Sequence, residues 1–347
     1  MNRKYFLEKS GISIFALLMG GITNKLHPSV FSSEHFITAT FIDKQEYDVV
    51  VIGGSYAGLS VSMSLARCLR KVLVIDAGKP RNAMVSKANN LFGNDGVKPS
   101  IMQNSVKDQL KRYKQYLNYY NGTVSKAEGS DLGFTVTINN GQKVTCKKIV
   151  FATGCTDPLP AIEGFKEQWG KNIHHCPYCH GFESTEGRTL VISEGFEGTI
   201  LMGSVAHWCK DLTFCTNGFS KLNNSITDFF TKENITLITD SVKQIVSAKN
   251  GDIDYVEFSN GNKIQFNHIY FHSNPIYQTV LLTNMGCKID ESKRMETNDF
   301  METNQKGVYA IGDISNKSME QIIWAANSGL MAAVGINNEL IAEKYKG

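Results

Sequence analysis

The sequence has little of the features that would assign it to a special class of protein. Its 36 Lys and Arg residues nearly balance 33 Asp and Glu residues, so a net charge of +3 provides no basic field for nucleic acid. Eight cysteines in 347 residues are too few for a disulfide scaffold. A composition that is 42% hydrophobic and 20% charged excludes a disordered, collagenous or polytopic membrane chain. It supports a globular protein of about two domains.

The first 45 residues have the order of a secretory leader. Three basic residues precede an apolar run from Ile12 to Ile22, which is too short to span a bilayer as a mature helix. The segment Arg3-Lys4-Tyr5-Phe6-Leu7 resembles a relaxed twin-arginine export motif. We therefore predict export to the periplasm or cell envelope without a stable transmembrane span; a cytoplasmic protein is the alternative. No clear cleavage site precedes Tyr47, so leader removal, an uncleaved anchor and a disordered leader all stay open.

From Tyr47 the sequence predicts a strand, a tight turn and a helix. The β-branched run from Tyr47 to Ile52 suits a strand buried on both faces, and Leu59 to Leu69 is helix-like. A second apolar run, Lys71 to Ile75, ends in Asp76, which lies 23 residues after Gly53. This βαβ unit has the geometry of a dinucleotide site, although the glycine segment alone also fits an ordinary strand-to-helix turn.

The residue types of this unit fit a phosphate-binding turn. Gly53 allows the tight turn, Gly58 lets helix and sheet pack closely, and Asp76 can accept hydrogen bonds from a ribose. Ser55 replaces the middle glycine, which is tolerable if its small side chain turns away from the phosphate. The candidate cofactor-binding residues of this unit are Gly53, Gly54, Ser55, Tyr56, Ala57, Gly58, Asp76 and Ala77.

Two later segments favour a cofactor site over an ordinary turn. Ile149 to Gly154 predicts a strand closing on a small-residue turn, and Gly307 to Asp313 predicts a strand that ends in a carboxylate before an apolar helix at about 320–340. With the glycine segment, they resemble flavoproteins that have two dinucleotide-binding domains. The resemblance implies bound FAD, with Asp313 on its ribityl chain. It adds the candidate residues Ala152, Thr153, Gly154, Gly312, Asp313, Gln321 and Ile322, the last two as flavin-ring contacts.

The region between these segments has strand and helix signals of its own. We therefore predict an α/β fold with two Rossmann-like dinucleotide-binding domains, a discontinuous FAD domain and an inserted NAD(P)-type domain. The predicted limits are 1–45 for the leader, 46–164 and 292–347 for the two parts of the FAD domain, and 165–291 for the inserted domain.

Cys176 and Cys179 form the one regularly spaced cysteine pair. A C-x-x-C can be half of a zinc site, a structural disulfide or a redox pair. No second pair of ligands follows at zinc spacing, and a disulfide closing so small a loop stabilises little. The redox interpretation is favoured, because one thiolate can attack a substrate disulfide while its neighbour resolves the mixed intermediate. We expect the others to be buried small hydrophobic side chains: Cys68, Cys146, Cys155, Cys209, Cys215 and Cys287.

With this pair, most of the chain is similar to the low-molecular-weight thioredoxin reductase family. The resemblance implies that Cys179 contacts the flavin, that Cys176 exchanges with substrate, and that the protein is a homodimer. The family's acidic proton donor after the pair is replaced here by His180, which titrates near neutrality and can do the same work. A structural cap is the alternative role for His180.

The motif Cys-Pro-Tyr-Cys-His-Gly at 176–181 resembles one branch of that family, which includes gliotoxin-type dithiol oxidases and uncharacterised bacterial reductase-like proteins. We therefore expect an FAD-dependent dithiol/disulfide oxidoreductase, thioredoxin-disulfide reductase-like, that acts on a thioredoxin-like protein or a small-molecule dithiol or disulfide. A flavin-dependent dithiol oxidase with oxygen as acceptor is the alternative. A regulatory flavin-binding protein with vestigial catalysis is a third interpretation.

Two features count against NAD(P)H as a ligand of the inserted domain. The predicted strand Asp211 to Cys215 is followed by no arginine for a 2′-phosphate, and Lys221 is the first cation after it. Glu194 and Glu197 bring negative charge to the turn that would hold a pyrophosphate. NAD(P)H therefore stays a candidate, and these features favour another electron donor or an oxidase.

Overall fold

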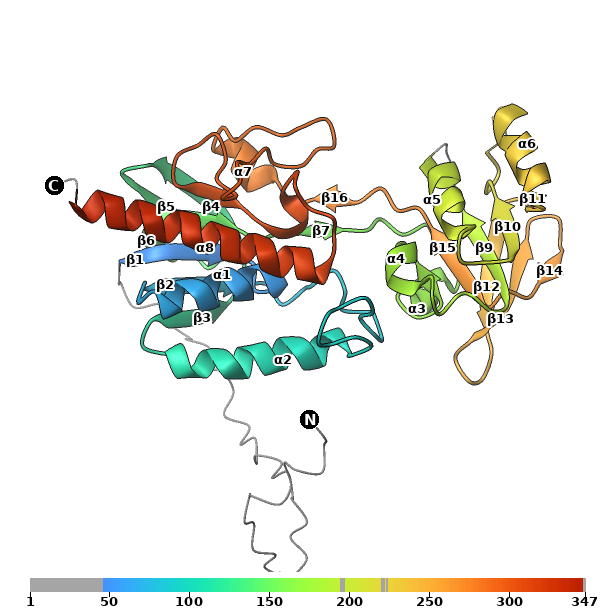
Figure 1. The fold of residues 1–347 in the computed structure, drawn as a ribbon, viewed down its shortest axis with the longest axis horizontal. Coiled ribbons are helices and arrows are strands. Elements are labelled where there is room, and N and C mark those ends of the chain that lie inside the picture. The colour runs from blue at the N-terminus through green and yellow to red at the C-terminus, as the bar shows by residue number, and fades with distance from the viewer. Residues whose placement is uncertain (1–45, 194–196, 220–221, 223, 346–347) are drawn as a thin grey trace, which may run out of the picture. The chain divides into compact units, whose positions relative to one another are not determined.

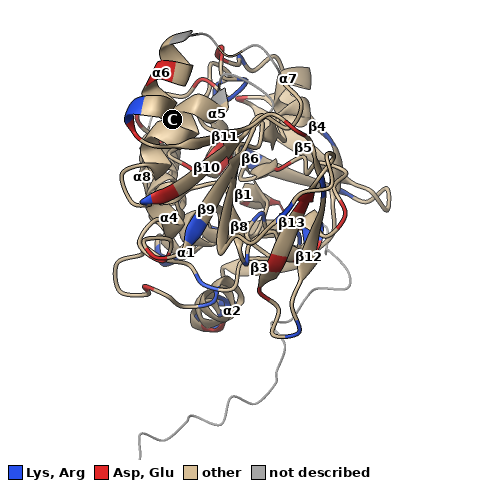
Figure 2. Ribbon diagram, turned by 90° about the vertical axis from the view of Figure 1, so that its right-hand side faces the viewer, with Lys and Arg blue, Asp and Glu red and all other residues tan. Residues whose placement is uncertain are grey.

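The computed structural model describes residues 46–193, 197–219, 222 and 224–345 (Figure 1). The predicted leader at 1–45 lies outside these residues, so export and leader cleavage stay predictions. Within the described part of the chain, no helix is both long enough and apolar enough to cross a membrane. Figure 2 shows Lys and Arg interspersed with Asp and Glu, in keeping with the small net charge.

The first sheet contains the predicted dinucleotide-binding strand at its centre. Its order is β3-β2-β1-β6-β5-β4, and β17 pairs with β6. The valines of β1 are fully buried, which explains the continuous β-branched run. The strands are β1 (Tyr47–Ile52), β2 (Val72–Asp76), β3 (Leu117–Asn121), β4 (Val124–Ser130), β5 (Gly133–Ile138), β6 (Lys143–Phe151) and β17 (Val308–Ala310).

Helices cover one face of this sheet, and a hairpin covers the other. On one face α8 (Ile322–Tyr345) lies along α1 (Tyr56–Arg67) (Figure 1), and both helices contribute to a core with β1, β2 and β6. On the other face, β4, β5 and the short α7 (Val280–Asn284) enclose a second core. The remaining helices of this part are α2 (Pro99–Leu110), η1 (Lys111–Tyr113) and η2 (Gly312–Ile314).

The inserted region has a sheet and two cores of its own. Its parallel sheet has the order β11-β10-β9-β15-β8, and a separate antiparallel sheet has the order β12-β13-β14. Its strands are β8 (Ile173–His174), β9 (Arg188–Ile192), β10 (Asp211–Cys215), β11 (Thr236–Ile238), β12 (Val242–Ser247), β13 (Ile253–Phe258), β14 (Lys263–Ile264) and β15 (His268–Phe271). Its helices are α3 (Phe165–Gln168), α4 (Pro177–His180), α5 (Glu197–Val205) and α6 (Asn224–Lys232). The α/β fold is therefore as predicted, with parallel strands β3-β2-β1-β6 in the first sheet and a parallel sheet in the inserted region.

The chain passes between the two sheets through a pair of short strands. β7 (Cys155–Thr156) pairs antiparallel with β16 (Ile276–Tyr277). After β16, Leu282 and Cys287 pack in the core of the first sheet. Apolar packing thus assigns these residues to the first sheet, earlier than the predicted limit at 291/292. The other domain limits stay predictions.

One of the six cysteines expected to be buried is exposed. Cys68 is the C-cap of α1, where the helix ends at the surface, so its prediction was wrong. The others are buried as expected: Cys146, Cys155, Cys209, Cys215 and Cys287.

Candidate active site

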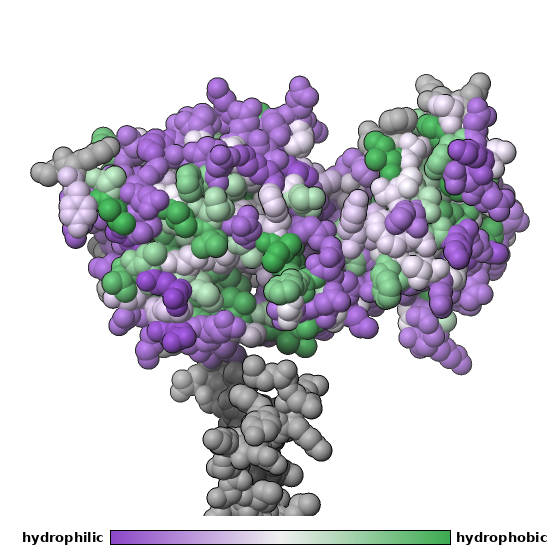
Figure 3. Space-filling view, viewed as in Figure 1, coloured by the Kyte–Doolittle hydropathy of each residue, from purple (hydrophilic) through white to green (hydrophobic). Residues whose placement is uncertain are grey.

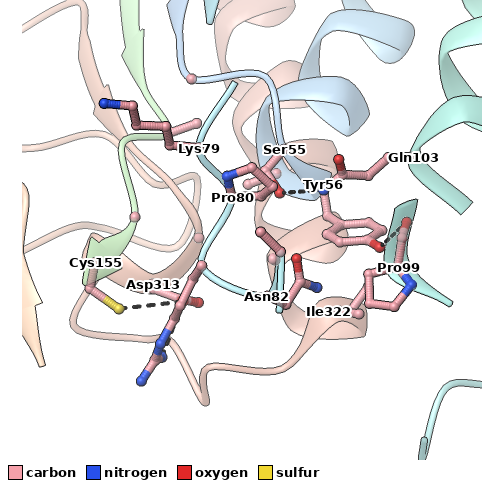
Figure 4. Close-up of a pocket in the computed structure, with 18 of the residues that line it drawn as sticks. Ser55, Tyr56, Lys79, Pro80, Asn82, Pro99, Gln103, Cys155, Asp313 and Ile322 are labelled. Carbon is pink, nitrogen blue, oxygen red and sulfur yellow. Dashed lines mark hydrogen bonds and ion pairs between the residues drawn. The ribbon is translucent and has the colours of Figure 1, made fainter. Parts of the chain in front are cut away.

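A cavity of about 740 Å³ brings the predicted segments together. Every predicted cofactor-binding residue except Gly58 lines it, and so do Cys179 and His180. Cys176 does not line the cavity, whereas Cys179 does. Figure 4 shows one part of its wall, with Ser55 near Pro80, Tyr56 beside Pro99, and Cys155 beside Asp313.

The glycines of the first turn lie where no side chain fits. Gly53 has φ +105°, and an added Cβ would lie 2.2 Å from the carbonyl oxygen of Ala152. A Cβ on Gly58 would lie 1.9 Å from the carbonyl oxygen of Gly53, so Gly58 has the predicted packing role. The turn therefore requires glycine at both positions, which brings the start of α1 close to β1 and leaves its first N–H groups beside the cavity.

Asp76 closes the turn from the end of β2. Its Oδ1 accepts a hydrogen bond from the Gly54 amide at 3.0 Å, and its Oδ2 accepts one from the Tyr119 hydroxyl. Each carboxylate oxygen has a second lone pair, so the capacity to accept a ribose hydroxyl is retained. The Ser55 hydroxyl accepts a hydrogen bond from Gln103 on α2 at 3.2 Å, so this side chain is engaged within the protein, as the turn needs.

Asp313 lies on η2 at the opposite side of the cavity. The amide of Gly312 donates to the Ser328 hydroxyl at 2.9 Å, which ties η2 to α8. Burial raises the pKa of Asp313, and the Arg81 guanidinium at 3.4 Å opposes that rise. The Cys155 thiol lies 3.7 Å from the same carboxylate (Figure 4). The glycine cradle, Asp76 and Asp313 fit the phosphate, ribose and ribityl groups of FAD.

The cysteine pair frames the short helix α4. Cys176 is its N-cap and Cys179 lies within it. The side-chain amide of Gln321 donates to both sulfurs, at 3.2 Å from Cys179 Sγ and 3.5 Å from Cys176 Sγ. The Asn89 side chain donates to the Cys179 carbonyl at 3.0 Å. Gln321, which was predicted to contact the flavin ring, therefore also contacts both redox sulfurs directly.

The two thiols differ in acidity. The hydrogen bond from Cys179 lowers the pKa of Cys176 most; burial opposes it, and backbone N–H groups of α4 and Gln321 add to it. The same hydrogen bond, with burial and charge repulsion, raises the pKa of Cys179. Cys176 is therefore the more acidic of the two thiols, which suits the sulfur that attacks a substrate disulfide.

His180 differs from the expectation that it titrates near neutrality. Its ring stacks on that of His174, with centroids 3.7 Å apart and 11° between planes. Burial, aided by the charge of His175, lowers the pKa of His180 to about 4. The imidazole is therefore neutral at pH 7, so it has no extra proton to donate, and its lowered pKa also makes it a weaker base than an ordinary histidine. Sequence reasoning missed this because the burial comes from packing against β8.

We expect this burial to make folding stability depend on pH. The unfolded imidazole binds protons from pH 6.5 downward, whereas the folded one stays neutral until about pH 4, so acidification favours unfolding. Between pH 7 and pH 5, wild type should lose about 1–2 kcal/mol more unfolding free energy than His180→Gln. Urea titrations at the two pH values measure this, with exposed His207→Gln as a control that should match wild type. Equal losses in wild type and His180→Gln would contradict it.

Sequence reasoning missed a cluster of ion pairs at the cavity wall. Arg81 pairs with Asp157 at 2.6 Å and with Glu320 at 2.6 Å. Burial lowers the pKa of the nearby His175, and the charge of Arg81 lowers it further. Arg81 lies shortly after Asp76, but its partners Asp157 and Glu320 are far from it in the sequence, so no local spacing indicates these pairs. In the described part of the chain, no group of three or more candidate ligands could hold a metal.

The features that counted against NAD(P)H fall partly outside the described residues. Glu194, Gly195 and Phe196 are outside them, as is Lys221. After β10, the described residues 216–219 supply no cation. In this segment the Asn217 side chain already accepts a hydrogen bond from the Val242 amide at 2.8 Å.

Comparison with known proteins identifies the family of the chain. The chain matches the pyridine nucleotide-disulphide oxidoreductase family over residues 47–329. It is 25% identical to thioredoxin reductase sirT of Leptosphaeria maculans over 84% of this chain and 93% of that protein. It is 24% identical to a thioredoxin reductase of Bacillus subtilis over 85% of this chain and 95% of that protein.

Solved structures agree with this match. The crystal structure of HlmI has a TM-score of 0.82 and 27% identity, covering 88% of this chain and 95% of HlmI. A putative thioredoxin reductase of Bacillus anthracis has a TM-score of 0.80 and 27% identity, covering 86% of this chain and all of its own. The protein therefore belongs to the pyridine nucleotide-disulphide oxidoreductase family, as an FAD-dependent enzyme that acts on sulfur groups.

Proposed function

We propose that the enzyme exchanges electrons between its Cys176–Cys179 pair and a thioredoxin-like protein or a small-molecule dithiol or disulfide. The observation that carries this is the Gln321 amide within hydrogen-bond distance of both sulfurs, beside a cavity lined by the FAD-binding residues. FAD, when bound, would give two electrons to the pair or take two from it. The thioredoxin reductase names of its relatives support a thioredoxin-type partner.

In the reducing direction, the Cys176 thiolate attacks one sulfur of the substrate disulfide. That S–S bond breaks, a mixed disulfide forms on Cys176, and the released thiolate takes a proton. Cys179 then attacks Cys176, which releases the second substrate thiol and leaves the enzyme pair oxidised. The hydrogen bond between the cysteines supports this order, since it favours the thiolate on Cys176.

A dithiol oxidase is the second candidate, and the unprotonated state of the His180 imidazole is consistent with it. Oxidation requires a base that takes a proton from the substrate thiol before that thiol attacks the enzyme disulfide. The neutral His180 imidazole on α4, next in sequence to Cys179, is in the form that accepts a proton, although its lowered pKa makes it a weak base, and it has no extra proton to give a leaving thiolate. Oxygen would then accept the two electrons.

The test is anaerobic bleaching of the bound flavin. We expect NADPH or NADH to bleach it if the reductase proposal holds, and the reduced pair then to reduce an added disulfide. A small dithiol should be added in a separate cuvette. Bleaching by the dithiol alone, reversed by air, would replace the reductase proposal with the oxidase. If NADPH, NADH and the dithiol all leave the flavin absorbance unchanged, both the reductase and the oxidase proposals are contradicted.

We also propose that the enzyme is a homodimer and that it is exported. An exposed apolar stripe supports the dimer, because it repeats at helical spacing along α8 (Figure 3). Its residues are Ile323, Leu330, Val334 and Ile341, each more than 40% exposed. A monomeric mass for the holoenzyme in sedimentation would contradict the dimer.

Export is supported by the order of charged and apolar residues in the leader. Recovery of all activity in the cytoplasm would contradict export.

A further inference from the structure

Glu320 has a backbone conformation that side chains rarely adopt. Its φ is +55°, and it directly precedes Gln321 and α8. The left-handed region is unfavourable for a residue with a Cβ, so the surrounding contacts must hold it there. Such an outlier beside reacting sulfurs calls for a functional reason.

The Glu320 carboxylate is anchored by three groups from different parts of the chain. Arg81 donates to Oε2 at 2.6 Å, the Tyr277 hydroxyl of β16 donates to Oε1 at 2.7 Å, and Arg294 forms an ion pair with Oε1. The side chain is 18% exposed, so solvent screens these contacts little.

The anchors are themselves fixed. Arg81 makes a bidentate pair with Asp157, at 2.8 and 2.6 Å, and the Ser273 hydroxyl donates to the same carboxylate at 2.7 Å. Arg294 also donates to the Ser318 carbonyl at 2.9 Å. Planar bidentate pairing of this kind restricts orientation as well as distance. Glu320 is therefore held by groups that have little freedom to shift.

The turn at Glu320 sets the direction in which the Gln321 side chain leaves the backbone. On the C-terminal side of Gln321, its carbonyl accepts the Ala325 amide at 2.9 Å, which begins α8. On its N-terminal side lies the left-handed turn at Glu320, whose backbone amide also donates to the Ser318 hydroxyl at 3.0 Å, and this turn sets where the Gln321 side chain leaves the backbone. The amide that results donates to both Cys179 and Cys176.

We propose that Glu320 is a positioning residue for the cysteine pair: its anchored carboxylate holds a left-handed turn that directs the Gln321 amide at the two sulfurs and so sets the reactivity of Cys176. This inference rests on the proposed function, because it concerns the same sulfurs. Glu320 touches neither sulfur and acts only through Gln321.

The test measures the thiol itself in holoenzyme reduced anaerobically. Iodoacetamide alkylation of Cys176 is followed by mass spectrometry across pH, with exposed Cys68 in the same sample as the internal reference. Gln321→Met, which lacks the amide, should slow alkylation of Cys176 at pH 7 about five- to tenfold and move its pH midpoint upward, as expected for a lost hydrogen bond to a thiolate. Glu320→Ala should do nearly the same, because it removes the anchor and keeps a Cβ.

Glu320→Gly separates the turn from the side chain. Glycine adopts positive φ freely, so in this variant at least half of the Cys176 alkylation rate that Glu320→Ala loses should return. The proposal would be overturned if Glu320→Gly and Glu320→Ala lost the same share of the Cys176 alkylation rate. It would also be overturned if Glu320→Ala kept the wild-type pH midpoint while the midpoint of Gln321→Met shifted. If Glu320→Ala loses its flavin, Glu320→Gln replaces it; this variant keeps an acceptor oxygen and should show a smaller shift in the same direction. A wild-type midpoint there would count against the proposal equally.

The readout also separates this inference from the proposed function. Alkylation reports the thiol whether or not the enzyme turns over. If the wild-type enzyme turns over a disulfide and the pH midpoint of Glu320→Ala is unshifted, only the positioning role is contradicted. If the wild-type enzyme shows no turnover and the midpoint shifts in both Glu320→Ala and Gln321→Met, the proposed function is contradicted and the positioning role is supported.

Discussion

Replacing Cys176 with serine is expected to lower turnover roughly a thousandfold or more while the protein stays yellow. Serine has nearly the same size, but its hydroxyl stays protonated at neutral pH and cannot form the mixed disulfide. Cys176 does not line the cavity that holds the FAD-binding residues, so flavin content should stay at the wild-type level. Steady-state disulfide or dithiol turnover and the flavin absorbance of the same preparation measure the two effects.

Two variants sharpen this result. Cys68→Ser removes an exposed thiol at the end of α1 and should leave turnover unchanged. Cys179→Ser should also stop turnover but leave Cys176 able to form a stable adduct with a disulfide probe, because no resolving thiol remains. Turnover above a tenth of wild type in Cys176→Ser would mean that the chemistry uses another group.

The elements that carry their own sequence signal were predicted well. The strand predicted at Tyr47–Ile52 is β1 with the same limits. The helix predicted from Leu59 begins at Tyr56, because the positive φ of Gly53 completes the turn early and the next residues form the first helical turn. Buried β-branched runs and obligatory glycines are local constraints, so a sequence shows them directly.

The rest of the site depends on contacts that no local pattern records. Arg81 and Glu320 are far apart in sequence, and only the folded chain brings them into one ion pair. The acidity of His180 follows from its burial against His174, which sequence spacing does not show. A residue's identity could be predicted here, whereas its protonation state required its neighbours.

A second large effect is expected at Gly58, where alanine should cost the enzyme its FAD. The added methyl would lie 1.9 Å from the backbone carbonyl of Gly53, and backbone cannot rotate away as a side chain can. The start of α1 would have to move off β1, taking with it the N–H groups that face a pyrophosphate. We expect FAD affinity to fall at least about a hundredfold, with a stability loss of about 2 kcal/mol or more, as overpacking of a tight contact implies.

Gly203→Ala is the matched control, because it makes the same change in a helix with room for it. Gly203 lies in α5, and nothing lies within 4 Å of a Cβ added there. Alanine should therefore raise stability by about 0.5–1 kcal/mol through its helix propensity and leave FAD content unchanged. Fluorescence titration of FAD into the apoprotein and thermal unfolding compare the two variants. Wild-type FAD affinity in Gly58→Ala would show that α1 can shift without disturbing the turn, and that the close contact between Gly58 and Gly53 does not shape the site.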